Sequence, residues 1–277
     1  MKIIEQYKTI SNCSCGGELE LINDNISCTK CQNELKYSDS YICLFSNDDV
    51  RPYWSMHMQT EFEKHGIVLE MSKKYDAFDT YYSKKEIAVD FFNRVLESGK
   101  IIVDLASGPS GYFGTVLKLL KNDQMFFITD GSPVILNAHM DANKGQRNIG
   151  YIDLDLDKPL PFKNDSIDCF MGNYLGNVMN YRQLITEAHR SLKPGGRFSV
   201  IEIFYDKDCE TATELRNSGK LYADLEVYIE FCEGIGFKLD RKGTIEHIVG
   251  KLDPSDSLPR NDTDQSKIIA FDFIKSN

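Results

Sequence analysis

One stretch decides the fold: Ile101-Ile102-Val103-Asp104-Leu105-Ala106-Ser107-Gly108-Pro109-Ser110-Gly111-Tyr112-Phe113. It has the pattern of a buried strand that ends in an acid, followed by a turn of small residues and the start of a helix. Small residues let the backbone approach a ligand, and the N–H groups at the start of a helix point outward. The stretch therefore indicates a ligand site at the carboxyl end of a strand, although a tight connection without a ligand has the same pattern.

Short apolar runs alternate with amphipathic stretches on both sides of this turn. We expect strands at 101–105, 125–129, 149–153, 167–171 and 198–204, and helices at 84–97, 112–120, 133–142, 181–192 and 223–232. This alternation predicts crossover connections and a parallel sheet with helices on both faces, the doubly wound α/β class. Two more strands, at 237–242 and 268–274, are expected to form a hairpin at one edge, giving seven strands in all.

Composition narrows the class of protein further. The chain has 277 residues, which suits one enzyme-sized domain with a small appendage. Its formal net charge of −10 disfavours general binding to nucleic acid, because phosphate backbones are repelled. No apolar run approaches the roughly 20 residues of a membrane span, and the N-terminus has no signal-peptide core. We therefore expect a cytoplasmic protein without a membrane partner.

Four of the eight cysteines fall within the first 31 residues, as Cys13-Ser14-Cys15 and Cys28-Thr29-Lys30-Cys31. In a reducing compartment, paired cysteines suggest metal ligands before disulfides. Two such turns brought together by hairpins predict a small four-cysteine zinc ribbon with Cys13, Cys15, Cys28 and Cys31 as ligands. The spacing departs from the usual Cys-x-x-Cys, because Asn12 stands where a first cysteine would be. A ribbon that has lost its metal, or one that uses Cys43, remains the alternative.

Three segments follow from these patterns. Residues 1–46 form the predicted zinc ribbon, residues 47–83 a linker and N-terminal cap segment, and residues 84–277 the α/β domain that would carry the ligand.

Acids at the ends of successive predicted strands indicate which ligand would bind. No Gly-x-x-x-x-Gly-Lys-Ser/Thr motif is present, which disfavours an ATP phosphate loop. Asp130 ends the second strand, where an acid can accept both hydroxyls of a ribose. Beyond the third strand, an acid beside an apolar residue can accept a hydrogen bond from an adenine amino group while its neighbour covers the ring. The fourth strand ends in Asn173 and Tyr174, which would lie over the reacting end of the ligand.

Three motifs carry a family resemblance: Asp104 to Gly111, Leu160-Pro161-Phe162 with Ser166 and Asp168, and Glu187-x-x-Arg190-x-Leu192-Lys193-Pro194-Gly195-Gly196. In this order and spacing, the chain from about residue 75 resembles the class I S-adenosylmethionine-dependent methyltransferases, which have a Rossmann-like fold. Ala106 and Ser110 replace two of the family's glycines. Because both are small, we expect the cofactor pocket to survive.

The resemblance implies a set of roles. Residues 104, 106, 108 and 111 would lie under the methionine portion of S-adenosylmethionine, Asp130 would hold the ribose, and Asn173 and Tyr174 would approach the sulfonium. Asp155 and Leu156 would hold the adenine, with Asp153 as the alternative acid. The cofactor-binding residues expected from the resemblance are thus Asp104, Ala106, Gly108, Gly111, Asp130, Asp155, Leu156 and Asn173.

A sulfonium is already an activated leaving group, so the protein mainly has to align the acceptor for in-line displacement. A base is needed only if the acceptor must lose a proton early. Glu202, at the end of the fifth strand, and Tyr174 are the first candidates as catalytic residues, followed by Tyr81, Tyr82 and His247.

We expect the acceptor to be a small molecule of unidentified class. A second hypothesis is methylation of an rRNA base, because a cysteine ribbon ahead of such a domain resembles the large-subunit rRNA guanine methyltransferases, whose ribbon helps to hold RNA. The acidic charge disfavours this, and so does the Asn173-Tyr174-Leu175-Gly176 exit, which lacks an Asn/Asp-Pro-Pro-aromatic sequence. A third hypothesis is a non-catalytic module that binds the cofactor and docks a protein.

Overall fold

The computed structural model describes residues 3–13, 15–22, 25–38, 40–45, 50–51, 55–56, 60, 81–108, 113–251 and 258–276. Gly111, predicted to lie under the cofactor, and most of the predicted 47–83 segment lie outside the described residues.

The centre of the molecule is a parallel sheet whose strands follow from continuous apolar runs. Its strands are β5 (Ile101–Leu105), β6 (Met125–Asp130), β7 (Ile149–Asp153), β8 (Ile167–Asn173) and β9 (Leu192–Tyr205). The predicted hairpin is also present, as β10 (Phe237–Val249) and β11 (Gln265–Lys275), both longer than expected. β11 lies antiparallel between β9 and β10, so these seven strands have the order β7-β6-β5-β8-β9-β11-β10.

The predicted count of seven strands is wrong for the sheet as a whole, which has eleven strands in the described part of the chain. The N-terminal strands β1 (Leu19–Ile22), β2 (Asn25–Cys28), β3 (Glu34–Tyr37) and β4 (Tyr41–Cys43) form an antiparallel meander. β4 then pairs in parallel with β7, from Tyr41 opposite Tyr151 to Cys43 opposite Asp153. An edge strand presents unpaired backbone groups, and β4 satisfies those of β7. Residues 11–45, which carry the four cysteines predicted as zinc ligands and are called the cysteine segment below, are therefore continuous with the central sheet.

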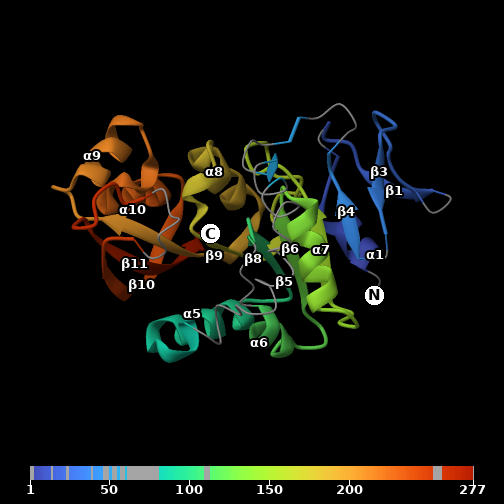
Figure 1. The fold of residues 1–277 in the computed structure, drawn as a ribbon. Coiled ribbons are helices and arrows are strands. Elements are labelled where there is room, and N and C mark those ends of the chain that lie inside the picture. Colours follow the sequence, from blue (N-terminus) through green and yellow to red (C-terminus); the bar gives the residue numbers. More distant parts are fainter. Residues whose placement is uncertain are drawn as a thin grey trace.

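Helices cover both faces of the sheet, as predicted (Figure 1). On one face lie α5 (Glu86–Glu97), α6 (Phe113–Lys118) and α7 (Pro133–Ala142); on the other lie α8 (Tyr181–Ser191), α9 (Glu210–Asn217) and α10 (Leu225–Gly234). Alternate residues of β5 point to opposite sides: Val103 packs in the core with α8 and α10, and Ile102 packs in the core with α5 and α6. Parallel strands buried on both faces explain the continuous apolar runs of the sequence.

The sequence patterns did not predict the first helix, α1 (Ile3–Ile10). Its apolar side packs on the same face as α8, with Tyr7 fully buried. The chain leaving α1 is tied to the 161–163 segment, since the N–H of Asn12 donates to the carbonyl of Pro161 at 2.8 Å and that of Lys163 to Ile10 at 2.7 Å. Short 3-10 turns, η1 (Tyr82–Lys84), η2 (Leu175–Asn177) and η3 (Leu221–Ala223), complete the described elements.

Candidate active site

The turn after β5 is built around the buried carboxylate of Asp104. The Ser107 hydroxyl donates a hydrogen bond to this carboxylate. Ala106 and Gly108 both have left-handed backbones, with φ of 52° and 66°. The turn is fixed to the next strand, because the N–H of Ser107 donates to the Thr129 carbonyl at 2.9 Å and the Thr129 hydroxyl donates to the Asp104 carbonyl at 2.8 Å. Residues 104–108 of the motif thus form a hydrogen-bonded turn at the carboxyl edge of the sheet.

Asp130 lies beside this turn, at the end of β6. Its carboxylate accepts the N–H of Gly108 at 3.0 Å through Oδ2 and the N–H of Ser132 at 2.8 Å through Oδ1. Burial raises the pKa of Asp130 from 3.8 to about 6, with the charge of Asp153 adding to the rise and the two amide donors opposing it. Because β5 and β6 are neighbours in parallel, Asp104 and Asp130 meet at one edge.

His139, on α7, supports the same turn. Its Nε2 lies 2.8 Å from the Gly108 carbonyl, and a carbonyl can only accept, so Nε2 carries the hydrogen. Burial lowers the pKa of His139 to about 4. The ring is therefore neutral at neutral pH and holds the turn as a donor.

The three acids after β7 have different surroundings. Asp153 is fully buried. Its carboxylate accepts hydrogen bonds from Arg51 at 2.7 and 2.8 Å, from the Tyr41 hydroxyl at 2.7 Å and from the Cys43 thiol at 3.4 Å. Asp155 is half-buried, and its Oδ1 accepts the N–H of Asp157 at 3.0 Å. Asp157 itself accepts the N–H of Asn180 at 2.9 Å.

These hydrogen-bond partners distinguish the two acids, Asp153 and Asp155, that are candidates for binding the adenine. The donors around Asp153 come from the N-terminal segment and occupy both carboxylate oxygens. Asp155, followed by the buried Leu156, keeps an oxygen on a half-buried surface and is the better candidate. Arg51 was missed in the sequence, since its partner lies 102 residues away and no local pattern connects them.

The exit of β8 brings Asn173 and Tyr174 next to η1. The Tyr82 hydroxyl donates to Asn173 Oδ1 at 3.3 Å, and Asn173 Nδ2 lies 3.2 Å from the same hydroxyl. Tyr174 has a left-handed backbone with φ of 53°, and burial together with the neighbouring Tyr82 raises its pKa well above 10. The exit is thus an aromatic and amide surface at the same sheet edge as Asp104, to which Met171 is paired.

Glu202 lies on β9, behind this exit. It is 1% exposed, and its Oε1 accepts the N–H of Leu175 at 3.2 Å and the hydroxyl of Tyr181 at 2.5 Å. The Tyr181 oxygen in turn lies 3.1 Å from that of Tyr228. Burial raises the pKa of Glu202 from 4.5 to about 7, against the two donors, which lower it. A carboxyl group with such a pKa can take up or release a proton near neutral pH.

The structure also brings the four predicted metal ligands together. The sulfur atoms of Cys13, Cys15, Cys28 and Cys31 all lie within 4.8 Å of one another. Cys13 and Cys31 are 3.6 Å apart and Cys15 and Cys28 3.4 Å apart. Zinc–sulfur bonds of about 2.3 Å in a tetrahedron separate sulfurs by about 3.8 Å, so the donor set fits zinc. Cys43 lies outside this group, and its thiol donates a hydrogen bond to Asp153.

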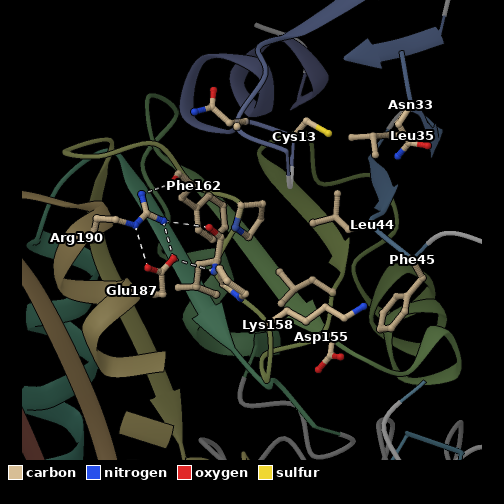
Figure 2. A pocket seen from close by; sticks show the side chains of 16 residues that line it. Cys13, Asn33, Leu35, Leu44, Phe45, Asp155, Lys158, Phe162, Glu187 and Arg190 are labelled. Atoms are coloured by element: carbon tan, nitrogen blue, oxygen red, sulfur yellow. Dashed lines mark hydrogen bonds and ion pairs between the residues drawn. The ribbon is translucent and has the colours of Figure 1, made fainter. Parts of the chain in front are cut away.

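A cavity of about 440 Å³ lies between the cysteine segment, the 154–162 loop and α8 (Figure 2). Figure 2 shows Leu44, Phe45 and Lys158 on one side of it and the ion pair of Glu187 and Arg190 on the other. Asp155 and Cys13 line it, but Asp104, Asp130 and Asn173 do not. Of the candidate cofactor acids, the cavity therefore includes only Asp155, and the two buried acids lie outside it.

Comparison with known proteins identifies the family. The sequence model of the ubiE/COQ5 methyltransferase family matches residues 57–223, more than half of the chain. The chain belongs to this family. The match begins after the cysteine segment and includes β5 to β9, with every acid described above.

Two curated relatives carry the same name. The chain is 32% identical over 122 residues to "Ubiquinone/menaquinone biosynthesis C-methyltransferase UbiE" of Methylococcus capsulatus, covering 43% of this chain and 48% of that protein. It is 32% identical over 111 residues to the protein of that name from Coxiella burnetii, covering 39% and 44%. The chain thus spans about half the length of the curated relatives it matches.

Solved structures share the fold. A putative methyltransferase from Bacillus halodurans has a TM-score of 0.52 at 13% identity, covering 68% of this chain and 98% of that one. A chain from the complex between the Haloferax volcanii Trm112 methyltransferase activator and a putative methyltransferase has a TM-score of 0.52 at 18% identity, covering 83% and 100%. Geranyl diphosphate C-methyltransferase from Streptomyces coelicolor has a TM-score of 0.51 at 10% identity, covering 68% and 77%.

The methyltransferase Rossmann-like fold expected from the sequence is confirmed. Within the described residues, no helix is both long enough and apolar enough to cross a bilayer.

Proposed function

We propose that this protein transfers a methyl group from S-adenosylmethionine to a carbon atom of a small-molecule acceptor. The observation that carries the proposal is the pair of buried carboxylates, Asp104 and Asp130, at the ends of adjacent strands and joined through the Gly108 turn. Membership of the ubiE/COQ5 family supports the cofactor. The names of the curated relatives support transfer to carbon and an acceptor of the quinone-precursor type.

The residues at the edge divide the cofactor between them. Asp104 holds the methionine end, where Ala106 and Gly108 let the backbone approach. Asp130 accepts the ribose hydroxyls, which would add to the two amide donors that already orient it. Asp155 takes the adenine amino group, and Leu156 covers the ring. Asn173 and Tyr174 lie where the acceptor would meet the sulfonium.

The cofactor, when bound, supplies a methyl group on an activated leaving group. The chain has to align the acceptor and to take the proton that the acceptor carbon loses after the new carbon–carbon bond forms. Glu202 accepts the N–H of Leu175, next to Tyr174, and burial raises its pKa to about 7, so it is the proposed proton acceptor. The raised pKa of Tyr174 keeps its hydroxyl protonated, which suits it to donate a hydrogen bond to an oxygen of the acceptor.

Two measurements test this function. Calorimetry should show that S-adenosylhomocysteine binds the wild-type protein and binds Asp130→Asn much more weakly. Transfer of a ¹³C-labelled methyl group into a metabolite extract, with total RNA as the second arm, then identifies the acceptor class. The carbon chemical shift of the new methyl group distinguishes carbon from nitrogen or oxygen as its neighbour. Failure of S-adenosylhomocysteine to bind at millimolar concentration refutes the proposal, and binding without transfer to any extract would favour a non-catalytic module.

We also propose that Cys13, Cys15, Cys28 and Cys31 hold one structural zinc ion. A small meander has little core of its own, and a tetrahedral metal would supply the missing free energy of folding. Elemental analysis of the untagged protein should find one zinc per chain, which Cys28→Ser removes. Cys209→Ser is the matched control, since Cys209 caps α9 and is not part of the cluster. A chain that contains no zinc, or a Cys28→Ser variant that retains it, refutes this assignment.

A further inference from the structure

Arg51 connects the N-terminal segment to the ends of two central strands. Its Nη1 donates to the Gly131 carbonyl at 2.8 Å and to Asp153 Oδ1 at 2.8 Å, and its Nη2 donates to Asp153 Oδ2 at 2.7 Å. Asp130 and Asp153 are paired across β6 and β7, so the guanidinium lies over the end of both strands. A planar guanidinium that forks onto a carboxylate has a fixed orientation.

The arginine is itself held in place from the cysteine side. Its guanidinium carbon lies 4.2 Å from the centre of the Phe45 ring, just beyond β4. The Tyr41 hydroxyl on β4 shares the Asp153 carboxylate with it. β4 is paired with β7, so Tyr41 and Asp153 belong to one sheet, and Phe45 follows β4 by two residues.

The Gly131 carbonyl is the important contact for the cofactor edge. It accepts from both Arg51 and the Ser55 hydroxyl. This carbonyl and the N–H of Ser132 belong to one planar peptide unit, in which the two groups point in opposite directions. Donors that hold the carbonyl on one side therefore fix the direction of the N–H on the other. That N–H donates to Asp130 Oδ1 at 2.8 Å.

We propose that Arg51 is a positioning residue for the cofactor: by holding the Gly131 carbonyl it fixes the peptide unit that orients the Asp130 carboxylate toward the ribose. The inference rests on the proposed function, because it takes Asp130 as the ribose acceptor. Arg51 would thus contribute to cofactor binding without touching the cofactor.

The test measures the affinity for S-adenosylhomocysteine by calorimetry in Arg51→Gln and Arg51→Lys, each alone and combined with Asp130→Asn. Arg51→Gln should weaken binding by roughly 3- to 30-fold, the range for residues that act through a neighbour. Arg51→Lys keeps the positive charge but cannot donate two parallel hydrogen bonds to the carboxylate, so its affinity for S-adenosylhomocysteine should lie between those of wild type and Arg51→Gln. Once Asp130→Asn has removed the orienting effect, Arg51→Gln should weaken binding by less than about twofold more.

Arg94→Gln is the matched control. Arg94 also binds a fully buried aspartate, Asp272, at 2.6 Å, but on β11, away from the cofactor edge. This variant should lose stability in the same way and bind S-adenosylhomocysteine within about twofold of wild type. As a spectroscopic readout, the ¹H–¹⁵N resonance of Ser132 should shift in Arg51→Gln and stay in place in Arg94→Gln.

Three results would overturn the inference. The first is wild-type affinity in a folded Arg51→Gln protein, and the second is an equal loss of affinity in the Arg51 and Arg94 variants. The third is a fully additive effect of Arg51→Gln and Asp130→Asn on the free energy of binding. If Arg51→Gln does not fold, Arg51→Lys answers the same questions. If the wild-type protein does not bind S-adenosylhomocysteine, the proposed function has failed first; if it binds and the Arg51 variants bind equally well, only this inference has failed.

Discussion

Glu202 should make the protein less stable as the pH rises. Its carboxyl is 1% exposed, and burial raises its pKa from 4.5 to about 7. Each unit by which the folded pKa exceeds the unfolded one is worth about 1.4 kcal/mol, so full ionisation costs roughly 3 kcal/mol of folding free energy. Because the folded pKa is the higher one, this contribution to stability is complete below pH 4.5 and is lost as the pH rises through 7.

Glu202→Gln removes the ionisation and keeps the shape of the side chain. The amide oxygen can still accept the bonds from Leu175 and Tyr181. Between pH 5 and pH 8 the free energy of unfolding of the wild-type protein should fall by about 2.5 kcal/mol relative to that of the variant. At pH 8 the variant should therefore be the more stable protein.

Urea unfolding followed by far-ultraviolet circular dichroism, at half-unit steps from pH 5 to pH 8.5, measures this difference. Other buried acids, such as Asp130, titrate in both proteins and cancel in the comparison. Glu97→Gln, at the exposed end of α5, is the control and should follow the wild-type profile. Parallel profiles of unfolding free energy against pH for wild type and Glu202→Gln would refute the argument that ionising this buried carboxyl destabilises the fold.

Three further outcomes are expected. The affinity for S-adenosylhomocysteine, measured by calorimetry, should fall by about tenfold per unit below pH 6, because a protonated Asp130 must lose its proton to accept both hydroxyls, and Asp130→Asn should abolish this dependence. Ala106→Gly should raise the free energy of unfolding in urea by about 0.5–1 kcal/mol, since the strain at a φ of 52° exceeds the added entropy of glycine. Gly236→Ala should lower it by roughly 2 kcal/mol, because Gly236 has a φ of 106° and a Cβ there would lie 2.8 Å from His189 Nε2; His189→Ala should restore part of the loss.

The core of the fold could be predicted because its signals are local. Strands β5 and β7 and helix α7 have the predicted boundaries, since a continuous apolar run or a helical period is complete within each segment. The hairpin strands were placed correctly but predicted too short. β10 is mostly exposed or half-buried beyond Phe237, so its apolar signal fades while the backbone pairing with β11 continues to Val249.

The attachment of the cysteine segment could not be predicted in this way. β4 has only three residues, and its partner β7 lies more than 100 residues further along the chain. Pairing of this kind depends on which sheet edge is open, a property of the folded domain and not of either segment. Arg51 could not be predicted for the same reason. Helix α1 was not predicted because it has eight residues with four apolar positions, a pattern that fits a helix and a strand about equally well.

The charges at the sheet edge support the proposed cofactor site. Asp104, Asp130 and Asp153 end three neighbouring strands, and three buried carboxylates would repel one another. Arg51 compensates Asp153. Asp104 and Asp130 are instead held by hydroxyl and amide donors, which orient a carboxylate and leave its charge in place. A ligand with a positive sulfonium and ammonium gains most from an edge of this kind. In the proposed function, Arg51 thus offsets the charge of Asp153 and leaves the charges of Asp104 and Asp130 for the cofactor.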